Sequence, residues 1–258
     1  MRLADQVAIV TGGANGIGRA CAELFAAEGA SVVIADIDTA AGPEVVAAIE
    51  ASGGLATFVR TDVGAAADAQ GLVEQTLEAF GRLDVLINNA GIIKTADFLE
   101  ISEADFDAVM RVNLKGAFLV GQAAARVMVE QGKGAIVNMS SANAVVAIAN
   151  QVPYVVSKGA LNQLTKVMAL ALADKNIRVN AVGPGSILTD LLKVVMDDEA
   201  ARQKILSRTP MGRCGEPIEV AKVALFLASD DASYLTGQCI YPDGGRLALN
   251  YTVPVAAG

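Results

Sequence analysis

The chain has 258 residues, of which 53% are hydrophobic and 19% charged, so it can bury a sizeable core as one α/β domain and is not expected to be disordered. Its net charge of −8, with no run of Lys or Arg, argues against nucleic acid or an anionic membrane as the main partner. The sequence contains no histidine, which excludes every mechanism with a histidine base and every histidine-ligated metal site.

Cysteine usage and hydropathy predict a cytoplasmic protein. Cys21, Cys214 and Cys239 are odd in number and far apart, which fits neither a disulfide framework nor a zinc site. The longest apolar stretches fall far short of the roughly 18 residues of a membrane span. Residues 1–6 lack the basic and apolar regions of a secretory signal. We therefore expect no metal site, no membrane and no nucleic-acid partner.

Short β-branched runs alternate with longer helical patterns, which predicts repeated βαβ units. The expected strands are Val7–Thr11, Ser31–Ala35, Ala56–Arg60, Val85–Asn88, Ala135–Ser140, Arg178–Val182 and Gln238–Tyr241. The expected helices lie near Ile17–Glu28, Ala40–Ala51, Ala67–Phe80, Ser102–Gln131, Pro153–Asp174 and Pro217–Ala228, with Ser102 as an N-cap. The predicted fold is α/β, a single-domain three-layer sandwich over residues 1–258 with a seven-stranded parallel sheet flanked by helices.

A glycine-rich turn over Thr11–Gly18 follows the first strand and opens the first helix. Such glycines let the backbone approach a pyrophosphate, whose charge is favoured at a helix N-terminus. The spacing is Gly-x3-Gly-x-Gly and differs from the common dehydrogenase fingerprint. A purely structural loop is the alternative, but the position between a strand and a helix favours a nucleotide site.

Asp36 ends the second strand, where an acidic residue accepts hydrogen bonds from an adenosine ribose diol. A carboxylate at this position repels a 2′-phosphate, and neither Asn15 nor Ile37 offers a positive charge to hold one. We therefore expect NAD as the cofactor, and NADP less so. The alternative for Asp36 is a turn residue at a strand end.

Polar and small residues also follow the third and fourth strands. Asp62-Val63 closes the third strand and Asn88-Asn89-Ala90-Gly91 closes the fourth. On position alone these residues could be turn formers. Because ligands bind at the carboxyl ends of strands in open α/β sheets, we expect them to line one crevice with the glycine turn.

Tyr154 and Lys158 are one helical turn apart in the expected helix from Pro153. A phenol of pKa ~10 is a poor base at neutral pH, but a nearby ammonium and a bound nicotinamide cation both favour the phenolate. Ser141 follows the fifth strand and could polarise a substrate carbonyl, whereas Ser140 is expected to be structural. The alternative for Tyr154 and Lys158 is an ordinary surface pair.

The chain resembles the short-chain dehydrogenase/reductase family in its ordinary branch, along nearly its whole length. The matching motifs read Thr11-Gly12-x3-Gly16-Ile17-Gly18, Asp62-Val63, Asn88-Asn89-Ala90-Gly91, Asn113, Ser141, Tyr154-x3-Lys158 and Pro184-Gly185-x3-Thr189. The resemblance implies a Rossmann-type fold, with Tyr154 as acid/base and Ser141 positioning the substrate oxygen. It also implies that Lys158 holds the nicotinamide ribose and lowers the tyrosine pKa, and that Asn113 supports a water relay.

The cofactor-binding residues follow from the turn, the strand ends and the resemblance, which assigns the carboxamide to Ile187 and Thr189. They are Gly12, Asn15, Gly16, Ile17, Gly18, Asp36, Ile37, Asp62, Val63, Asn89, Ala90, Gly91, Tyr154, Lys158, Pro184, Gly185, Ile187 and Thr189. Tyr154 would remove the hydroxyl proton of a secondary alcohol while hydride passes to NAD, or return it to a ketone in the reverse reaction.

The substrate is expected to be a small alcohol, polyol or sugar-like molecule. Residues expected around it are Ile93, Lys94, Asn143, Val145, Ile148, Asn150, Gln151, Ser186, Leu188, Leu191, Leu192 and Val195. The aliphatic members suit a cyclic or medium-chain alcohol, and the polar members suit a polyol, a sugar or a carboxylate. Ser186–Glu216 has poor periodicity, and we expect it to form a mobile lid.

Two alternative functions remain open. One is a 3-oxoacyl-(acyl-carrier-protein) reductase that uses NADPH, against which Asp36 and the acidic pI of about 4.6 argue. The other is a non-catalytic NAD-binding sensor or scaffold, which the intact Ser141, Tyr154 and Lys158 disfavour. The resemblance further implies a homotetramer through Ser102–Gln131 and Pro153–Asp174, whose alternative role is an ordinary core face. The apolar end Tyr251–Gly258 could pack on a neighbouring subunit.

Overall fold

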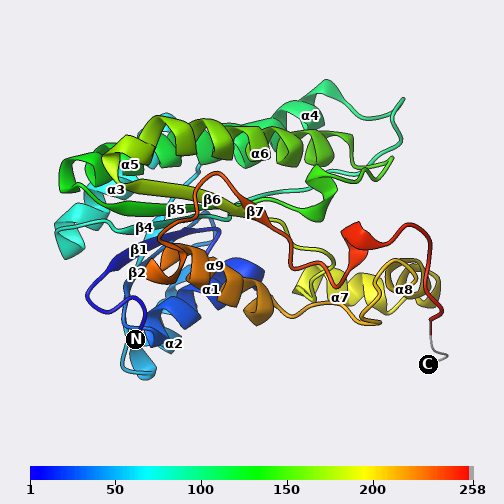
Figure 1. The fold of residues 1–258 in the computed structure, drawn as a ribbon, viewed down its shortest axis with the longest axis horizontal. Coiled ribbons are helices and arrows are strands. Elements are labelled where there is room, and N and C mark those ends of the chain that lie inside the picture. The colour runs from blue at the N-terminus through cyan, green and yellow to red at the C-terminus, as the bar shows by residue number, and fades with distance from the viewer. Residues whose placement is uncertain (256–258) are drawn as a thin grey trace.

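A parallel sheet with the strand order β3-β2-β1-β4-β5-β6-β7 forms the centre of the computed structural model, which describes residues 1–255 (Figure 1). The strands are β1 (Val7–Thr11), β2 (Ser31–Asp36), β3 (Leu55–Arg60), β4 (Val85–Asn88), β5 (Gly134–Met139), β6 (Ile177–Val182) and β7 (Cys239–Ile240). Every neighbouring pair is parallel. All seven predicted strands are present, and none departs from its predicted limits by more than one residue at either end. The predicted fold class is confirmed.

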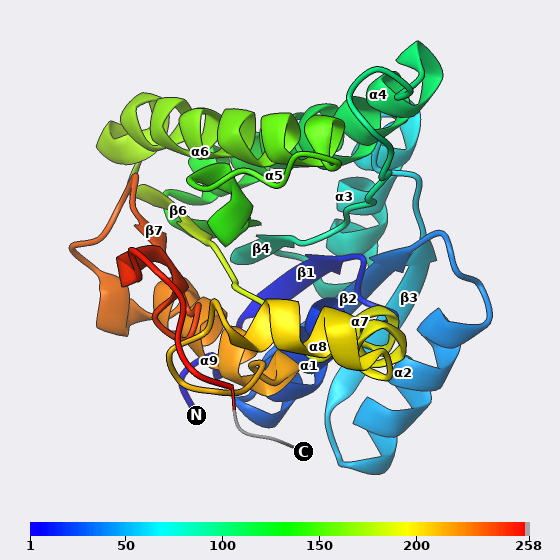
Figure 2. The same ribbon diagram turned by 90° about the vertical axis from the view of Figure 1, so that its right-hand side faces the viewer.

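Helices cover both faces of the sheet (Figures 1 and 2). One layer holds α1 (Gly16–Ala27), α2 (Ala41–Ala51) and α9 (Pro217–Ala228), and the other holds α3 (Ala66–Phe80), α5 (Ala117–Gln131) and α6 (Val152–Leu172). Because side chains alternate along a strand, Ala8 and Val10 of β1 enter the core under the first layer and Ile9 enters the core under the second. Burial on both faces explains why the strands are almost continuously apolar.

The predicted helix Ser102–Gln131 is divided into three helical segments. It consists of α4 (Glu103–Met110), a π-helical turn η1 (Arg111–Gly116) and α5. Ser102 is the N-cap as expected, since its side chain accepts a hydrogen bond from Asp105 N at 3.1 Å. The π-turn changes the phase of the helix and carries Asn113, whose side chain is 1% exposed. A single periodic pattern does not reveal such a turn.

The segment Ser186–Glu216 contains two helices that the sequence pattern did not predict. They are α7 (Asp190–Met196) and α8 (Glu199–Leu206), and both lie beyond the carboxyl ends of the strands (Figure 1). Each has only about two turns, too few for a clear apolar period. Asp198 caps α8 by accepting hydrogen bonds from Ala200 N and Ala201 N. The short 3-10 turns of the fold are η2 (Ala142–Ala144), η3 (Ala173–Lys175), η4 (Asp230–Ala232) and η5 (Arg246–Ala248).

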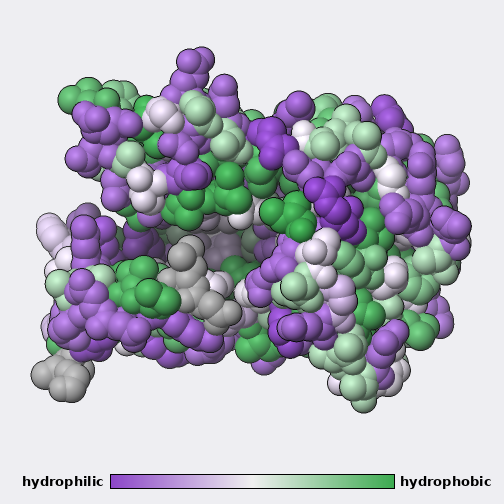
Figure 3. All heavy atoms as spheres, turned by 180° about the vertical axis from the view of Figure 1, so that it is seen from behind, coloured by the Kyte–Doolittle hydropathy of each residue, from purple (hydrophilic) through white to green (hydrophobic). Residues whose placement is uncertain are grey.

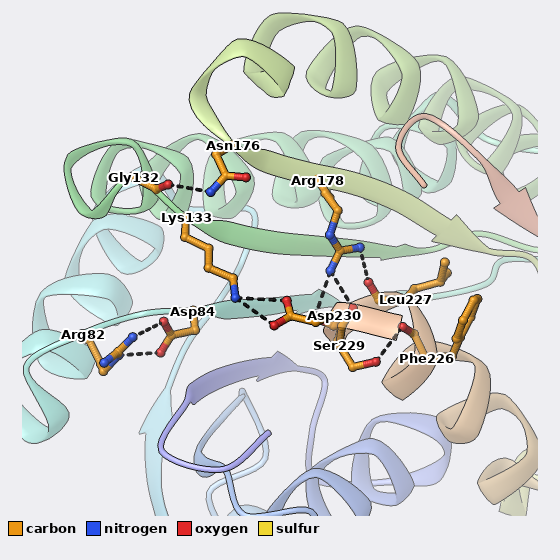
Figure 4. Close-up of polar contacts among 11 residues, drawn as sticks. Arg82, Asp84, Gly132, Lys133, Asn176, Arg178, Phe226, Leu227, Ser229 and Asp230 are labelled. Atoms are coloured by element: carbon orange, nitrogen blue, oxygen red, sulfur yellow. Dashed lines mark hydrogen bonds and ion pairs between the residues drawn. The ribbon is translucent and has the colours of Figure 1, made fainter. Parts of the chain in front are cut away.

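Several groups of polar contacts lie at the amino ends of the strands (Figure 4). Asp84 accepts hydrogen bonds from Val7 N at 2.9 Å and from the Arg82 guanidinium at 2.7 and 2.8 Å. Lys133 Nζ lies 3.0 Å from an Asp230 carboxylate oxygen. Arg178 donates to three main-chain carbonyls at the C-terminal end of α9, where a cation is favoured. These charged side chains therefore have partners within the protein and stabilise the fold.

No helix within residues 1–255 is long and apolar enough to cross a membrane. The same residues hold no cluster of acidic or cysteine side chains arranged to bind a metal ion. Cys21, Cys214 and Cys239 are free thiols, and burial raises the pKa of Cys21 to about 12.

Candidate functional site

The glycine-rich turn between β1 and α1 is held close to the end of β4. Gly12 and Gly16 have φ of +63° and +54°, values that side chains other than glycine rarely adopt. A Cβ at Gly12 would lie 2.9 Å from Ala90 Cα. Asn89 Nδ2 donates to the carbonyls of Thr11 and Gly12, both at 3.0 Å. The turn is thereby fixed as a cradle at the N-terminus of α1, which suits an anionic group.

A cavity of about 560 Å³ opens over this turn. It is lined by most of the predicted cofactor residues, namely Gly12, Asn15, Gly16, Ile17, Asp36, Ile37, Asp62, Val63, Asn89, Ala90, Gly91 and Thr189. Gly18 does not line it, since the α-carbon of Gly18 faces the Gly12 carbonyl and the Asn89 side chain. Gly18 therefore allows close packing behind the cradle, as expected of the last glycine of such a turn.

The Asp36 carboxylate is fixed at the edge of this cavity. One of its oxygens accepts from Ala14 N and the other from Asp38 N, each at 3.1 Å. Sequence reasoning missed further lining residues, which are Ala35, Thr61, Ile92, Arg111 and Val112. Arg111 is the one cation among the described lining residues, and its Nη1 lies 2.9 Å from Asp62 Oδ2. The edge next to Asp36 therefore offers a carboxylate, and the nearby cation already has a partner.

A second cavity, of about 640 Å³, continues from the first. The two share Ile17, Asn89, Gly91 and Thr189 as lining residues. The second is also lined by Ser141, Tyr154, Lys158, Pro184, Gly185 and Ile187. Seen from behind, the molecular surface is hollowed at this end of the sheet (Figure 3). The structure therefore joins the predicted nucleotide and chemistry residues in one continuous cleft.

Tyr154 and Lys158 extend from the first turns of α6 toward the end of β5. Lys158 Nζ lies 5.6 Å from the centre of the Tyr154 ring and donates to Met139 O at 2.6 Å. Burial lowers the pKa of Lys158 to about 8. Burial also raises the pKa of Tyr154, and the hydrogen bond with Ser141 acts in the opposite direction. The three polar groups therefore meet at the wall of the cavity, where Ser141 and Lys158 are buried and Tyr154 is partly buried.

The predicted lowering of the Tyr154 pKa is not produced by the protein groups alone. The largest influence on the Tyr154 pKa is burial, which disfavours the phenolate. Lys158 is itself buried, with a pKa of about 8, and its ammonium is hydrogen-bonded to a main-chain carbonyl. The prediction also includes the positive charge of an oxidised nicotinamide ring beside the phenol, which belongs to the cofactor.

Asn113 connects the loop after β4 to α6. Its Oδ1 accepts from Ile92 N at 2.8 Å, and its Nδ2 donates to Ile92 O at 2.9 Å and to Ser157 Oγ at 3.1 Å. Its side chain thus makes structural contacts, and Asn113 lines neither cavity. Ser140 donates to Asn162 Oδ1 at 2.7 Å and has the structural position predicted for it.

The residues predicted around the substrate divide into two groups. Those that line the second cavity are Ile93, Asn143, Ile148, Gln151, Ser186, Leu192 and Val195. Lys94, Val145, Asn150 and Leu188 do not line it. The Lys94 ammonium lies 3.4 Å from an Asp105 oxygen, and Val145 is 61% exposed. The side chain of Leu191 and residues 256–258 fall outside what the structure describes.

Eight residues that line this cavity were not predicted as cofactor or substrate residues, and they are Thr95, Met139, Ser140, Ala142, Lys204, Ile205, Arg208 and Arg246. Three of these are cations. Lys204 and Ile205 belong to α8, Arg208 follows it, and Arg246 begins η5. The motifs gave no signal for the three cations, because their positions depend on helical segments that the sequence pattern did not predict.

Known proteins of similar sequence and structure are oxidoreductases. Residues 12–246 match the profile of the family described as enoyl-(acyl carrier protein) reductase. The 3-oxoacyl-(acyl-carrier-protein) reductase FabG of Thermotoga maritima is 44% identical over 245 residues, which cover 95% of this chain and 99% of that protein. A 2,5-dichloro-2,5-cyclohexadiene-1,4-diol dehydrogenase of Sphingobium indicum is 43% identical over 250 residues, covering 96% and 99%. A solved structure of a candidate 2-deoxy-D-gluconate 3-dehydrogenase from Agrobacterium tumefaciens with bound NADP has a TM-score of 0.89 at 38% identity, covering 96% and 98% of the two chains.

Proposed function

The chain belongs to the short-chain dehydrogenase/reductase family, and from this premise we propose that it is an NAD-dependent oxidoreductase that interconverts a secondary alcohol and a ketone. The observation that carries the proposal is the convergence of Ser141, Tyr154 and Lys158 in a cavity that continues into the glycine cradle. A protein that only binds a nucleotide has no need for a phenol, a hydroxyl and an amine gathered at that junction.

The residues of the cleft fit a nicotinamide dinucleotide. The cradle of Gly12 and Gly16 at the N-terminus of α1 suits the pyrophosphate, and Asp36 suits the adenosine ribose. Pro184, Gly185, Ile187 and Thr189 line the junction near Tyr154, where they would hold the nicotinamide end. When bound there, the nicotinamide ring supplies the acceptor or donor of hydride.

The chain's own residues then transfer the proton and orient the substrate oxygen. Tyr154 accepts the hydroxyl proton of an alcohol as phenolate, or donates it to a ketone oxygen as phenol. Ser141 donates a hydrogen bond to the same oxygen and fixes its distance from the tyrosine. Lys158 places a positive charge beside the phenol ring, which favours the phenolate, and it is positioned to bind the nicotinamide ribose.

Asp36 supports NAD as the preferred cofactor. Its carboxylate is held by two main-chain amides at the edge of the cavity, where a 2′-phosphate would meet a negative charge. Arg111, which also lines that cavity, is paired with Asp62. The related structure from Agrobacterium tumefaciens contains NADP, so the cofactor preference is a property to measure on this chain.

The proposed substrate is a small alcohol, polyol or sugar-like molecule. Aliphatic residues Ile93, Ile148 and Leu192 share the second cavity with Asn143 and Gln151, whose side chains hydrogen-bond each other at 3.1 Å. A 3-oxoacyl-(acyl-carrier-protein) reductase is the alternative that the similarity to FabG raises, and its preference for NADPH would conflict with Asp36.

We further propose a homotetramer in solution, with soluble small-molecule substrates as the only other partners. Exposed apolar side chains on α5 and α6 suit a subunit interface, and they include Phe118, Val156, Val167 and Leu170, the last of which is 83% exposed.

A substrate survey tests the proposed activity. Purified protein is mixed with NAD or NADP and a panel of cyclic alcohols, aliphatic alcohols, polyols, sugars and hydroxy acids, and reduced-nicotinamide absorbance is followed. Turnover with NAD that exceeds turnover with NADP is the expected result. A panel without turnover, repeated with ketones and acyl thioesters in the reductive direction, would leave the non-catalytic binder as the better explanation.

A further inference from the structure

The cavity that contains Tyr154 is lined by cations and by no carboxylate among its described residues. Lys158, Lys204, Arg208 and Arg246 all line it. The chain as a whole carries a net charge of −8, so this local excess of positive charge runs against the general composition. The proposed mechanism gives a role to Lys158 alone. The other three cations lie on α8, directly after it and on the C-terminal segment, outside the motifs of the cofactor site.

Main-chain hydrogen bonds bring Arg208 and Arg246 to the same cavity. The segment after α8 is joined to the C-terminal segment by Met211 N, which donates to Gly244 O at 3.1 Å, and by Val253 N, which donates to Ser207 O at 2.8 Å. Burial and the positive charge of Arg208 both lower the pKa of Arg246, so the two guanidinium groups interact electrostatically. The fold thus holds two like charges near each other at a cost in Coulomb energy.

Neither arginine side chain has a hydrogen-bond or ion-pair partner among the groups described within residues 1–255, which exclude the side chains of residues 190 and 191. Asp243 is the carboxylate whose charge acts on Arg246, but its oxygens accept hydrogen bonds from Gly245 N at 2.9 Å and Leu247 N at 2.7 Å. That carboxylate therefore shapes the turn before η5. Arg246 is only partly exposed, so its unused donors are not simply those of a free surface side chain.

At the opposite end of the sheet, the cationic side chains that stabilise the fold have partners within the protein. Arg82, Lys133 and Arg178 each make hydrogen bonds or ion pairs with carboxylates or main-chain carbonyls there (Figure 4). Arg208 and Arg246 differ from them, because both line a cavity and neither side chain has an acceptor among the groups that the structure describes. Arg246 is partly buried, whereas Arg208 is exposed. A partly buried charge at a ligand cavity, without a partner among the described side chains, indicates that a ligand supplies the partner of Arg246, and Arg208 offers a second guanidinium at the same cavity.

We propose that the substrate carries an oxyanion, which Arg208 and Arg246 bind in this cavity while the reacting carbon faces Tyr154. This inference rests on the proposed function and names the substrate class of the same site. Two guanidinium groups can together offer paired N–H donors to a carboxylate or a phosphate. Lys204, exposed on α8, adds to the positive potential that draws an anion toward the cavity.

Two sources share this chemistry. The oxyanion belongs either to the substrate itself, as in a hydroxy acid or an oxo acid, or to the phosphates of a carrier such as coenzyme A. The cavity of about 640 Å³ lies in the range of small-molecule sites and has room for a compact acid. The experiment below separates the two sources.

Substrate pairs in which one member carries an oxyanion and the other is uncharged provide the test. With NAD, 3-hydroxybutyrate is compared with its methyl ester, and gluconate with glucitol. With NADH, acetoacetyl-CoA is compared with the uncharged acetoacetyl-N-acetylcysteamine. We expect one anionic member to exceed its neutral partner in kcat/KM by about 10- to 100-fold, mainly through a lower KM, and the difference to shrink as salt is added. Preference for 3-hydroxybutyrate or gluconate identifies a carboxylate, and preference for the coenzyme A thioester identifies a phosphate.

The double variant Arg208→Gln/Arg246→Gln assigns the effect to the two arginines. It is expected to lose about 100-fold in kcat/KM for the preferred anion and less than about 3-fold for the neutral partner. Arg202→Gln is the matched control, because Arg202 lies on α8, pairs with Glu199 at 2.6 Å and does not line the cavity. Equal losses on both members of a pair, or the same loss in Arg202→Gln, would overturn the assignment.

A binding measurement keeps this inference separate from the proposed activity. Thermal unfolding of the NAD-loaded protein is followed with each probe, and the anionic members are expected to raise Tm in the wild type and not in the double variant. Turnover of neutral members as fast as anionic ones would overturn the oxyanion site and leave the dehydrogenase intact. Anion-dependent stabilisation without turnover of any probe would retain the site and count against the proposed reaction.

Discussion

Lys158 Nζ lies 5.6 Å from the centre of the Tyr154 ring, one helical turn away along α6. Lys158 is buried and Tyr154 partly buried at the carboxyl end of β5, and loss of contact with water shifts the pKa of each. Burial opposes the phenolate and the ammonium alike. The chain therefore maintains an electrostatically unfavourable arrangement, which is typical of active sites and gives each residue a distinct experimental signature.

Replacing Lys158 with Met is expected to stabilise the protein near neutral pH. The pKa of Lys158 falls from its usual 10.5 to about 8 on burial, a difference worth on the order of 3 kcal/mol. Because the unfolded chain binds the proton more tightly, this group adds stability as pH rises from about 8 to about 10.5. The gain in the free energy of unfolding should therefore be largest at pH 7 and shrink between pH 8 and pH 10.5. The loss of the hydrogen bond from Lys158 to Met139 O reduces this gain.

Urea unfolding at a series of pH values measures this effect. Lys166→Met is the control, since Lys166 is exposed and lies on the same helix. A gain that does not change with pH would show that the burial of charge at Lys158 is not its origin.

Replacing Ser141 with Ala is expected to move the pH profile of alcohol oxidation to higher pH. The reaction needs Tyr154 as phenolate, and the hydrogen bond from Ser141 lowers the pKa of that phenol. Without this hydrogen bond, the rise of kcat/KM with pH begins at a higher pH. The rate also falls by about 10²-fold, because the substrate oxygen loses a hydrogen-bond donor. Ser140→Ala, which removes a hydroxyl bonded to Asn162, should leave the profile in place. Identical profiles for Ser141→Ala and the wild type would contradict the role of Ser141.

Replacing Asp36 with Ala is expected to narrow the preference for NAD over NADP. The substitution removes the acceptor for the ribose diol and the charge that repels a 2′-phosphate, so the ratio of kcat/KM values should fall by about 10- to 100-fold. Asp38→Ala is a suitable control, because the Asp38 carboxylate caps α2 through Ala40 N and Ala41 N and does not line the cavity. An unchanged ratio in Asp36→Ala would refute the assigned role.

The mass of the protein in solution tests the expected homotetramer. Light scattering should give about four times the chain mass of 26.4 kDa. Leu170→Glu, on the exposed side of α6, should lower the mass, while Val194→Glu on α7 should not, although both residues are exposed apolar side chains. A wild-type mass equal to that of one chain excludes the assembly.

Much of the fold follows from local sequence because the strands are buried on both faces and their apolar runs are unambiguous. Asp36 and the glycine turn could likewise be placed, since strand ends and left-handed glycines fix them locally. Asn113 could not, because its inward position depends on a π-turn that adds no signal to the helical period. Arg208 and Arg246 depend on long-range main-chain contacts between the segments that follow α8 and β7. Such contacts are not encoded in any short motif.

The pKa of Tyr154 illustrates a different limit of sequence reasoning. The sequence shows a lysine one turn from the tyrosine, which favours the phenolate. It does not show how deeply both are buried, and burial is the larger influence. The direction of the shift in the protein alone is therefore set by packing.

The most direct test of the central proposal compares the wild type with Tyr154→Phe in a single experiment. Reduced-nicotinamide absorbance measures turnover with NAD and the preferred substrate of the survey, and calorimetry measures NAD binding to both proteins. The account predicts that Tyr154→Phe binds NAD nearly as well as the wild type and loses turnover by about 10²- to 10⁴-fold. Turnover at the wild-type rate in Tyr154→Phe would contradict it.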